Sequence, residues 1–96
     1  MGFEYKLTCV PVPTELDKPL RAIPGFSEYD RQYGQYHFRA PENQDTARMA
    51  DASVAIEPDG VYFIDHCGNT ALANGVLRRL VDLALFEADE VIIREL

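Results

Sequence analysis

The sequence is poor in the features that mark disulfide-stabilised and membrane proteins. Two cysteines, Cys9 and Cys67, are too few for a disulfide framework, so we expect free thiols. No apolar run approaches the ~18 residues that span a bilayer. The opening MGFEYK lacks the basic and apolar regions of a secretory signal. We therefore expect no membrane segment and, by default, a cytoplasmic protein.

Positive charge is also scarce, and it is unevenly distributed. The chain has 16 acidic and 9 basic residues, a formal net charge of −7. Residues 1–50 carry seven acids and six bases, which leaves −1, whereas residues 51–96 carry nine acids and three bases, which leaves −6. This field repels nucleic-acid phosphates and anionic membranes, so we expect neither as a partner. It attracts a basic protein, although acidity also serves solubility alone.

The bulk composition is that of one globular domain. Apolar residues make up 47% and charged residues 26% of the chain, which argues against disorder. A chain of 96 residues is long enough for one hydrophobic core. We find no internal repeat, linker or low-complexity tract, and we treat residues 1–96 as a single small globular domain.

The first half of the chain predicts two strands separated by less regular segments. Residues 3–10 alternate apolar and polar side chains, which is typical of a strand with one wet face. Residues 28–40 are rich in tyrosine and alternate again, which predicts a strand that is broken or bulged at Gly34. Prolines exclude one long helix over 14–27, which is either a single helical turn or a loop. We expect a short helix within 41–51, where a proline suits the first helical position.

The second half has clearer patterns. Residues 53–57 and 61–67 predict a β-hairpin, because a Pro-Asp-Gly turn lies between them. Apolar residues recur at helical spacing over 70–86, which predicts an amphipathic helix. Residues 90–96 predict a final strand.

These elements predict an α+β fold, with a mixed four- to five-stranded sheet and one long helix (about 70–86) packed on one face. The chain ends in a hairpin–helix–strand unit, and the strand–helix–strand order over 61–96 implies a right-handed crossover and parallel pairing of the strands at 61–67 and 90–96. The sequence does not decide which sheet face the helix covers. Val91, Ile92 and Ile93 are apolar on both faces of their strand. That strand is therefore either central or covered, for example by a second copy of the chain.

Residues 65–70 read DHCGNT, which places an acid, a base and a thiol side by side. Side chains alternate in a strand, so we expect Asp65 and Cys67 to point toward the rim of the core and His66 to point the opposite way. Adjacent strand residues do not make the nucleophile–base pair of an enzyme, so we predict no catalytic residues here. If the protein is an enzyme, the candidates are Cys67, Asp65, His66 and, from elsewhere in the chain, His37.

The same corner precedes the predicted helix, which gives it a second candidate role. Gly68, Asn69 and Thr70 lie where free backbone N–H groups and the helix dipole attract anions. Asn69 or Thr70 also suits the helix N-cap. We weigh an anion-binding site or a reactive Cys67 thiolate against a purely structural cap, and we favour the cap.

The residues that bind metals are scattered. Cys9, His37, His66 and Cys67 form neither a CxxC nor an HxxxH pattern, so we expect no metal and no cofactor. The tyrosines and arginines of 28–40 suit the stacking of single-stranded nucleic acid or a protein interface. A strand with its rings in the core is the simpler interpretation.

The sequence therefore favours a non-catalytic protein-binding module, regulatory or inhibitory, over an enzyme. We expect its interface to use acidic and apolar residues of the second half: Glu57, Asp59, Leu85, Phe86, Glu87, Asp89, Glu90 and Glu95. One alternative is a small enzyme or anion-binding protein that uses the Cys67–Thr70 corner. Another is a homodimeric structural protein joined through the C-terminal strand or through Leu85 and Phe86.

Overall fold

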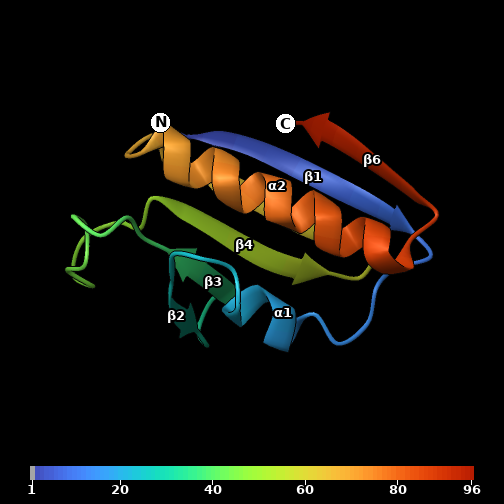
Figure 1. The fold of residues 1–96 in the computed structure, drawn as a ribbon, viewed down its shortest axis with the longest axis horizontal. Helices are drawn as coiled ribbons and strands as arrows, with labels where there is room; N and C mark the ends of the chain where they lie inside the picture. Colours follow the sequence, from blue (N-terminus) through green and yellow to red (C-terminus); the bar gives the residue numbers. More distant parts are fainter. Residues whose placement is uncertain (1) are drawn as a thin grey trace.

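The structure is a computed structural model, and it describes residues 2–96. Within this range the chain forms two helices and one six-stranded sheet (Figure 1). In chain order the elements are β1 (Phe3–Val10), α1 (Asp17–Arg21), β2 (Phe26–Asp30), β3 (Gln35–Phe38), β4 (Ala52–Glu57), β5 (Gly60–Asp65), α2 (Thr70–Glu87) and β6 (Glu90–Glu95). The fold is α+β, as predicted. Neither helix of this range is long and apolar enough to cross a membrane.

The strands lie in the order β2-β3-β4-β5-β1-β6, and each neighbouring pair is antiparallel. The predicted mixed sheet of four to five strands is therefore wrong in strand number and in direction. β5 and β6 run in the same direction, but they do not pair, because β1 lies between them. Tyr5 of β1, for example, pairs with Phe63 on one side and Glu95 on the other.

α2 covers one face of this sheet (Figure 1). Its residues Ala73, Val76 and Leu80 are buried, which confirms the predicted apolar stripe. They pack into one cluster with strand residues that alternation directs to the same face: Leu7, Val54, Val61 and Phe63. Burial of each large apolar side chain stabilises the fold by about 1.5–3 kcal/mol.

α1 extends the same layer over β3. Its residue Leu20 is fully buried in the main core cluster. The hydroxyl of Tyr36 donates to Asp17 Oδ1 at 2.6 Å, and burial together with this carboxylate raises the pKa of Tyr36 to about 12. Pro19 stands in the first turn of the helix, where its missing N–H leaves no helical bond unmade. The segment 14–27 thus contains one short helix flanked by loops.

β2 and β3 form a hairpin where the sequence predicted one interrupted strand over 28–40. Gly34 stands in the turn with a φ of +65°, a left-handed conformation that glycine adopts without strain. The interruption at Gly34 is therefore a turn. A separate irregularity in the register lies within β2, between Phe26 and Glu28.

The short helix predicted within 41–51 does not form, and β3 connects to β4 through a loop. In place of helical hydrogen bonds, side chains at both ends of the loop bond to its backbone. Arg39 Nη1 donates to the carbonyl oxygen of Asp45 at 2.9 Å. Asp51 Oδ2 accepts the N–H of Ala40 at 2.8 Å. These bonds hold the loop closed at the end of the sheet.

β4 and β5 form the predicted hairpin, and its turn has no room for a side chain. A Cβ on Gly60 would lie 1.9 Å from the carbonyl oxygen of Leu7. At the other end of β5, the predicted cap of α2 is present. Asn69 Oδ1 accepts the N–H of Leu72 at 2.9 Å.

β6 lies at one edge of the sheet (Figure 1). Of the two alternatives for this strand, a central position is therefore wrong, because β1 occupies the inner position. Val91 packs against the end of α2, whereas Ile92 and Ile93 are 49% and 48% exposed. Within residues 2–96 nothing covers the outer side of this strand.

Candidate functional site

The DHCGNT corner connects β5 to α2, and the strand ends at Asp65. Cys67 has a left-handed backbone with a φ of +66°, and its N–H donates to Asp65 Oδ1 at 2.8 Å. This turn breaks the alternation and leaves Cys67 exposed, so its predicted place at the rim of the core is wrong. Cys9 is buried, and burial raises the pKa of its thiol.

His66 lies on the open face of the sheet, together with the other histidine of the chain. The register pairs His37 with Ser53 of β4, and Ser53 with Ile64 of β5. Nδ1 of His37 lies 2.7 Å from the Ser53 hydroxyl oxygen, and Nε2 of His66 lies 2.9 Å from it. The Cys67 thiol instead faces the carbonyl oxygen of Asp65, at 3.9 Å. The fold thus brings the two histidines together around Ser53, and the Cys67 thiol is not part of this group.

The neighbours of this group assign its protons. Nε2 of His37 lies 3.9 Å from Asp30 Oδ2, which favours a proton on that nitrogen. Nδ1 of His37 then accepts the Ser53 hydroxyl, and the Ser53 oxygen accepts the Nε2–H of His66. In this arrangement the Ser53 hydroxyl donates to one ring and accepts from the other.

The hydrogen-bonded group of His37, Ser53 and His66 is largely shielded from solvent. Ser53 is 1% exposed, although it lies on the face that α2 does not cover. Burial and, second, the nearby His37 lower the pKa of His66. The Ser53 hydroxyl is enclosed between two rings, so a substrate carbonyl does not reach it, as a nucleophile would require.

A cavity of about 590 Å³ opens beside the two histidines. The loop after β3 forms one wall, and the polar side chains that line the cavity are Glu28, Asp30, Gln35, His37, Arg39, Thr46, Arg48 and His66. Arg39 is 3% exposed, and its Nη2 donates to Glu28 Oε1 at 3.1 Å. Within residues 2–96 the Arg39 Nε is the one buried side-chain nitrogen or oxygen without a partner.

The charges in this cavity largely neutralise one another. Burial alone raises the pKa of Glu28, but hydrogen bonds from Ser27 and Arg39 outweigh it and lower the pKa overall. Asp30 and Arg48 add one further negative and one further positive charge to the lining. Across residues 2–96, no three His, Cys, Asp or Glu side chains gather as a metal site. The cavity therefore offers no charge of one sign that would select a ligand.

Sequence reasoning missed Ser53, although a signal for it exists. Counting back from the Pro-Asp-Gly turn gives the hairpin register, which pairs Ser53 with Ile64. Ile64 is two residues before His66 and shares its face. His37 comes from a different hairpin, and no local pattern predicts that β3 pairs with β4.

The predicted anion-binding residues lie beside acidic groups of the chain itself. Asn69 caps α2 with its Oδ1, and its Nδ2 donates to Glu42 Oε1 at 3.0 Å. A Cβ on Gly68 would lie 2.6 Å from Asp51 Oδ1, so a second carboxylate lies against the backbone there. Thr70 is exposed at the first position of the helix. Two carboxylates near this helix N-terminus oppose the binding of another anion.

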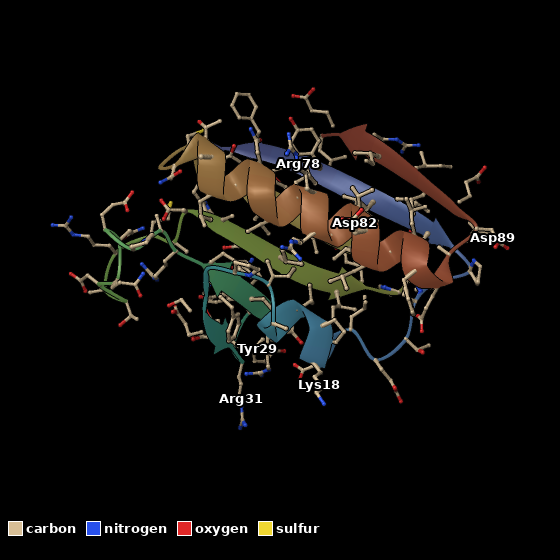
Figure 2. The ribbon with its side chains drawn as sticks, in the orientation of Figure 1. Lys18, Tyr29, Arg31, Arg78, Asp82 and Asp89 are labelled. Carbon is tan, nitrogen blue, oxygen red and sulfur yellow. The ribbon has the colours of Figure 1, made fainter. Side chains whose placement is uncertain are left out.

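Most of the acidic residues predicted for an interface lie at the opposite end of the sheet. Glu57 and Asp59, in and beside the β4–β5 turn, both pair with Lys6. Glu87, at the end of α2, accepts the N–H of Thr14 at 2.8 Å. Asp89 projects into solvent from the link between α2 and β6 (Figure 2).

Apolar side chains are exposed at this acidic end. Phe86, in the last turn of α2, is 91% exposed, and the adjacent Leu85 is 50% exposed. Glu90 begins β6 here and is exposed, whereas Glu95 lies at the other end of that strand. We call the surface formed by Leu85, Phe86, Glu87, Asp89 and Glu90 the acidic end.

The tyrosine-rich segment divides between core and surface. Tyr36 and Phe38 are 4% and 0% exposed and belong to the core. Tyr29 lies under the guanidinium of Arg21, 5.4 Å from its ring centre. Arg31 points away from the sheet, at the edge far from Asp89 (Figure 2). The rings of this segment chiefly stabilise the fold.

Comparison of the chain with protein-family models, with curated proteins and with solved structures found no match.

Proposed function

We propose that the chain is a non-catalytic protein-binding module and that its acidic end contacts a basic partner. The observation that supports this most directly is Phe86, which is 91% exposed at the end of α2. Aromatic side chains are the commonest anchors of protein interfaces, and a large exposed ring beside other apolar groups marks such a surface.

A groove beside Phe86 supports the same proposal. It has a volume of about 440 Å³, and it runs between α1 and α2. Pro19, Ile23 and Leu83 contribute apolar side chains to its lining, and Arg79 and Asp82 are its two charged residues. An apolar side chain of a partner fits the groove, and the carboxylates of the adjoining acidic end favour a basic residue in the same partner. Such carboxylates mainly raise the association rate and the specificity of binding.

The competing enzyme hypothesis has less support. The histidines and Ser53 bond to one another in an enclosed group, and the Cys67 thiol lies outside it. The acidic end, in contrast, keeps exposed side chains that make few internal contacts.

The test uses a fluorescent peptide of alternating leucine and lysine, with a leucine–glutamate peptide as its control. We expect the lysine peptide to bind and to lose affinity several-fold when ionic strength rises from ~0.05 to ~0.5 M. Phe86→Ser and Asp89→Lys should each weaken binding in fluorescence anisotropy. Tyr33→Ser is the matched control, because Tyr33 is 68% exposed far from the acidic end.

Two outcomes contradict the proposal. One is equal binding of the lysine and glutamate peptides. The other is an equal loss of affinity in the Phe86→Ser and Tyr33→Ser variants, which would show that any exposed ring serves.

A further inference from the structure

The two edges of the sheet differ in their protection against further pairing. β2, at one edge, has an irregular register between Phe26 and Glu28, and its side chains are all partly buried. β6, at the other edge, pairs regularly with β1 and contains neither proline nor bulge, and its charged residues Glu90, Arg94 and Glu95 lie toward its two ends. Natural sheets usually protect an edge with bulges, prolines or charges, because free backbone groups there invite another strand.

The hydrogen bonds of β6 show which amides face outward. The N–H of Leu96 donates to the carbonyl oxygen of Glu4 in β1, at 2.9 Å. Amides alternate in direction along a strand, so those of Arg94 and Ile92 also face β1. The amides of Val91, Ile93 and Glu95 therefore face outward. They form a row of donors without a partner strand, along a segment whose central residues Val91, Ile92 and Ile93 are apolar.

The side chains of β6 complement a second copy of the same strand. A twofold axis perpendicular to the sheet pairs two antiparallel strands so that residues of the same face stand opposite each other. With the axis at Ile92, each Glu90 stands opposite Arg94 of the second copy. On the α2 side, each Val91 stands opposite Ile93 of the second copy.

We propose that β6 pairs antiparallel with β6 of a second copy of this chain, in the register centred on Ile92, to form one continuous sheet. This register uses the outward amides of Val91 and Ile93 for its hydrogen bonds. It also makes two Glu90–Arg94 cross-strand pairs of opposite charge, each of which favours association modestly. The like-charged Asp89 and Glu95 stand opposite each other at the ends, where solvent screens them.

The neighbouring twofold register, centred on Ile93, lacks these charge pairs. It places Arg94 opposite Ile92 and Glu90 opposite Leu96. The charges of β6 thus select the register centred on Ile92. They also select a second copy over an arbitrary extended peptide, which would not carry both charges in the required order.

Cysteine crosslinking tests the register directly, in a Cys67→Ser background that removes the exposed native thiol. In the proposed dimer the two copies of residue 92 form a non-hydrogen-bonded pair with Cα atoms about 4.5 Å apart, which suits a disulfide. The two copies of residue 93 lie roughly 8 Å apart, which does not. We expect Ile92→Cys to oxidise to a covalent dimer much faster than Ile93→Cys. Faster crosslinking of Ile93→Cys, or none in either variant, overturns the proposal.

Charge exchange tests the two pairs by sedimentation equilibrium of the uncrosslinked protein. Arg94→Glu should weaken dimerisation about tenfold, because it replaces two attractive pairs with two repulsive ones. The double variant Glu90→Arg/Arg94→Glu should restore most of the affinity. A monomeric wild-type chain at ~1 mM, or a double variant no better than Arg94→Glu, contradicts the proposal. Circular dichroism at low concentration verifies that each variant is folded.

The proposed dimer shares Asp89 and Glu90 with the acidic end, but Phe86 and Arg94 each belong to one surface alone and separate the two proposals. Phe86→Ser should leave the dimer intact, and Arg94→Glu should leave the lysine peptide bound. Failure of one proposal therefore leaves the other open to its own test.

Discussion

The two faces of the sheet are stabilised by different kinds of side-chain interaction. The face under α2 is a continuous apolar cluster, in which Leu7 and Phe63 are 0% and 1% exposed. The open face carries polar groups that satisfy one another, such as Lys6 with two carboxylates and Ser53 with two histidines. Ser53 is nevertheless as buried as the core residues, because its neighbours' side chains cover it. Burial in this molecule therefore does not require a helix layer.

The largest loss of stability should come from a substitution of Phe63, at the centre of the face that α2 covers. Phe63→Ala removes a fully buried ring and leaves a cavity, which should lower the free energy of unfolding by about 3–5 kcal/mol. Urea denaturation followed by circular dichroism measures the loss. Tyr62→Ala, one residue away on the open face, is the control. An equal loss in both variants would show that the two faces contribute alike.

The next largest effect should come from Ser53, at the centre of the open face. Ser53→Ala leaves ring nitrogens of both histidines without their shared partner, which should destabilise the fold by about 1–3 kcal/mol. The same denaturation assay measures it. Thr8→Ala, a hydroxyl change on the same face, should have a much smaller effect. If both variants are equally stable, the histidine–serine group contributes nothing to the fold.

A smaller loss of stability should come from removal of the N-cap at the start of α2, the helix that covers one face of the sheet. Asn69→Ala removes the acceptor of the Leu72 N–H and should cost about 1 kcal/mol. Asn69→Asp retains the acceptor and should remain closer to wild type. Asn74→Ala, on the exposed side of α2, separates the cap from general helix propensity. A loss in Asn74→Ala as large as in Asn69→Ala would contradict the role of the cap.

The smallest effect should be a pH dependence of the open face. Burial lowers the pKa of His66 from its ordinary 6.5. As pH falls below about 6.5, His66 therefore becomes protonated in the unfolded chain while it is still neutral in the folded chain. The free energy of unfolding should be highest above that pH and should fall as pH drops below it.

Urea midpoints at pH ~7.5 and ~5.5 measure this effect. The carboxylates with lowered pKa, Asp17, Glu28 and Asp59, titrate at lower pH and act in a separate window. His66→Asn should flatten the dependence between the two pH values. An unchanged slope in that variant would assign the dependence to another group.

Local patterns predicted the elements that depend on neighbouring residues. Period-two alternation located β1, the Pro-Asp-Gly turn located the β4–β5 hairpin, and helical spacing located α2 with its Asn69 cap. Each of these signals lies within about a dozen residues of sequence. Such signals were sufficient for the α+β class.

The rest depends on contacts between distant segments. The strand–helix–strand order suggested that β5 and β6 are neighbours, but β1 from the other end of the chain fills that position. The conformation of the loop after β3 depends on hydrogen bonds from long side chains such as Arg39. The periodicity of the sequence does not reveal the partners of these side chains. The candidate site shows the same limit, because His37 and His66 meet across Ser53 through pairings between three strands.

The inner position of β1 imposes an order on the folding of the chain. β1 precedes both of its partners in sequence, β5 by some fifty residues and β6 by more, so neither of its ladders closes until those strands are present. Such long-range closure is typical of slow-folding domains. The β4–β5 hairpin closes locally, so we expect it to form before the two ladders of β1.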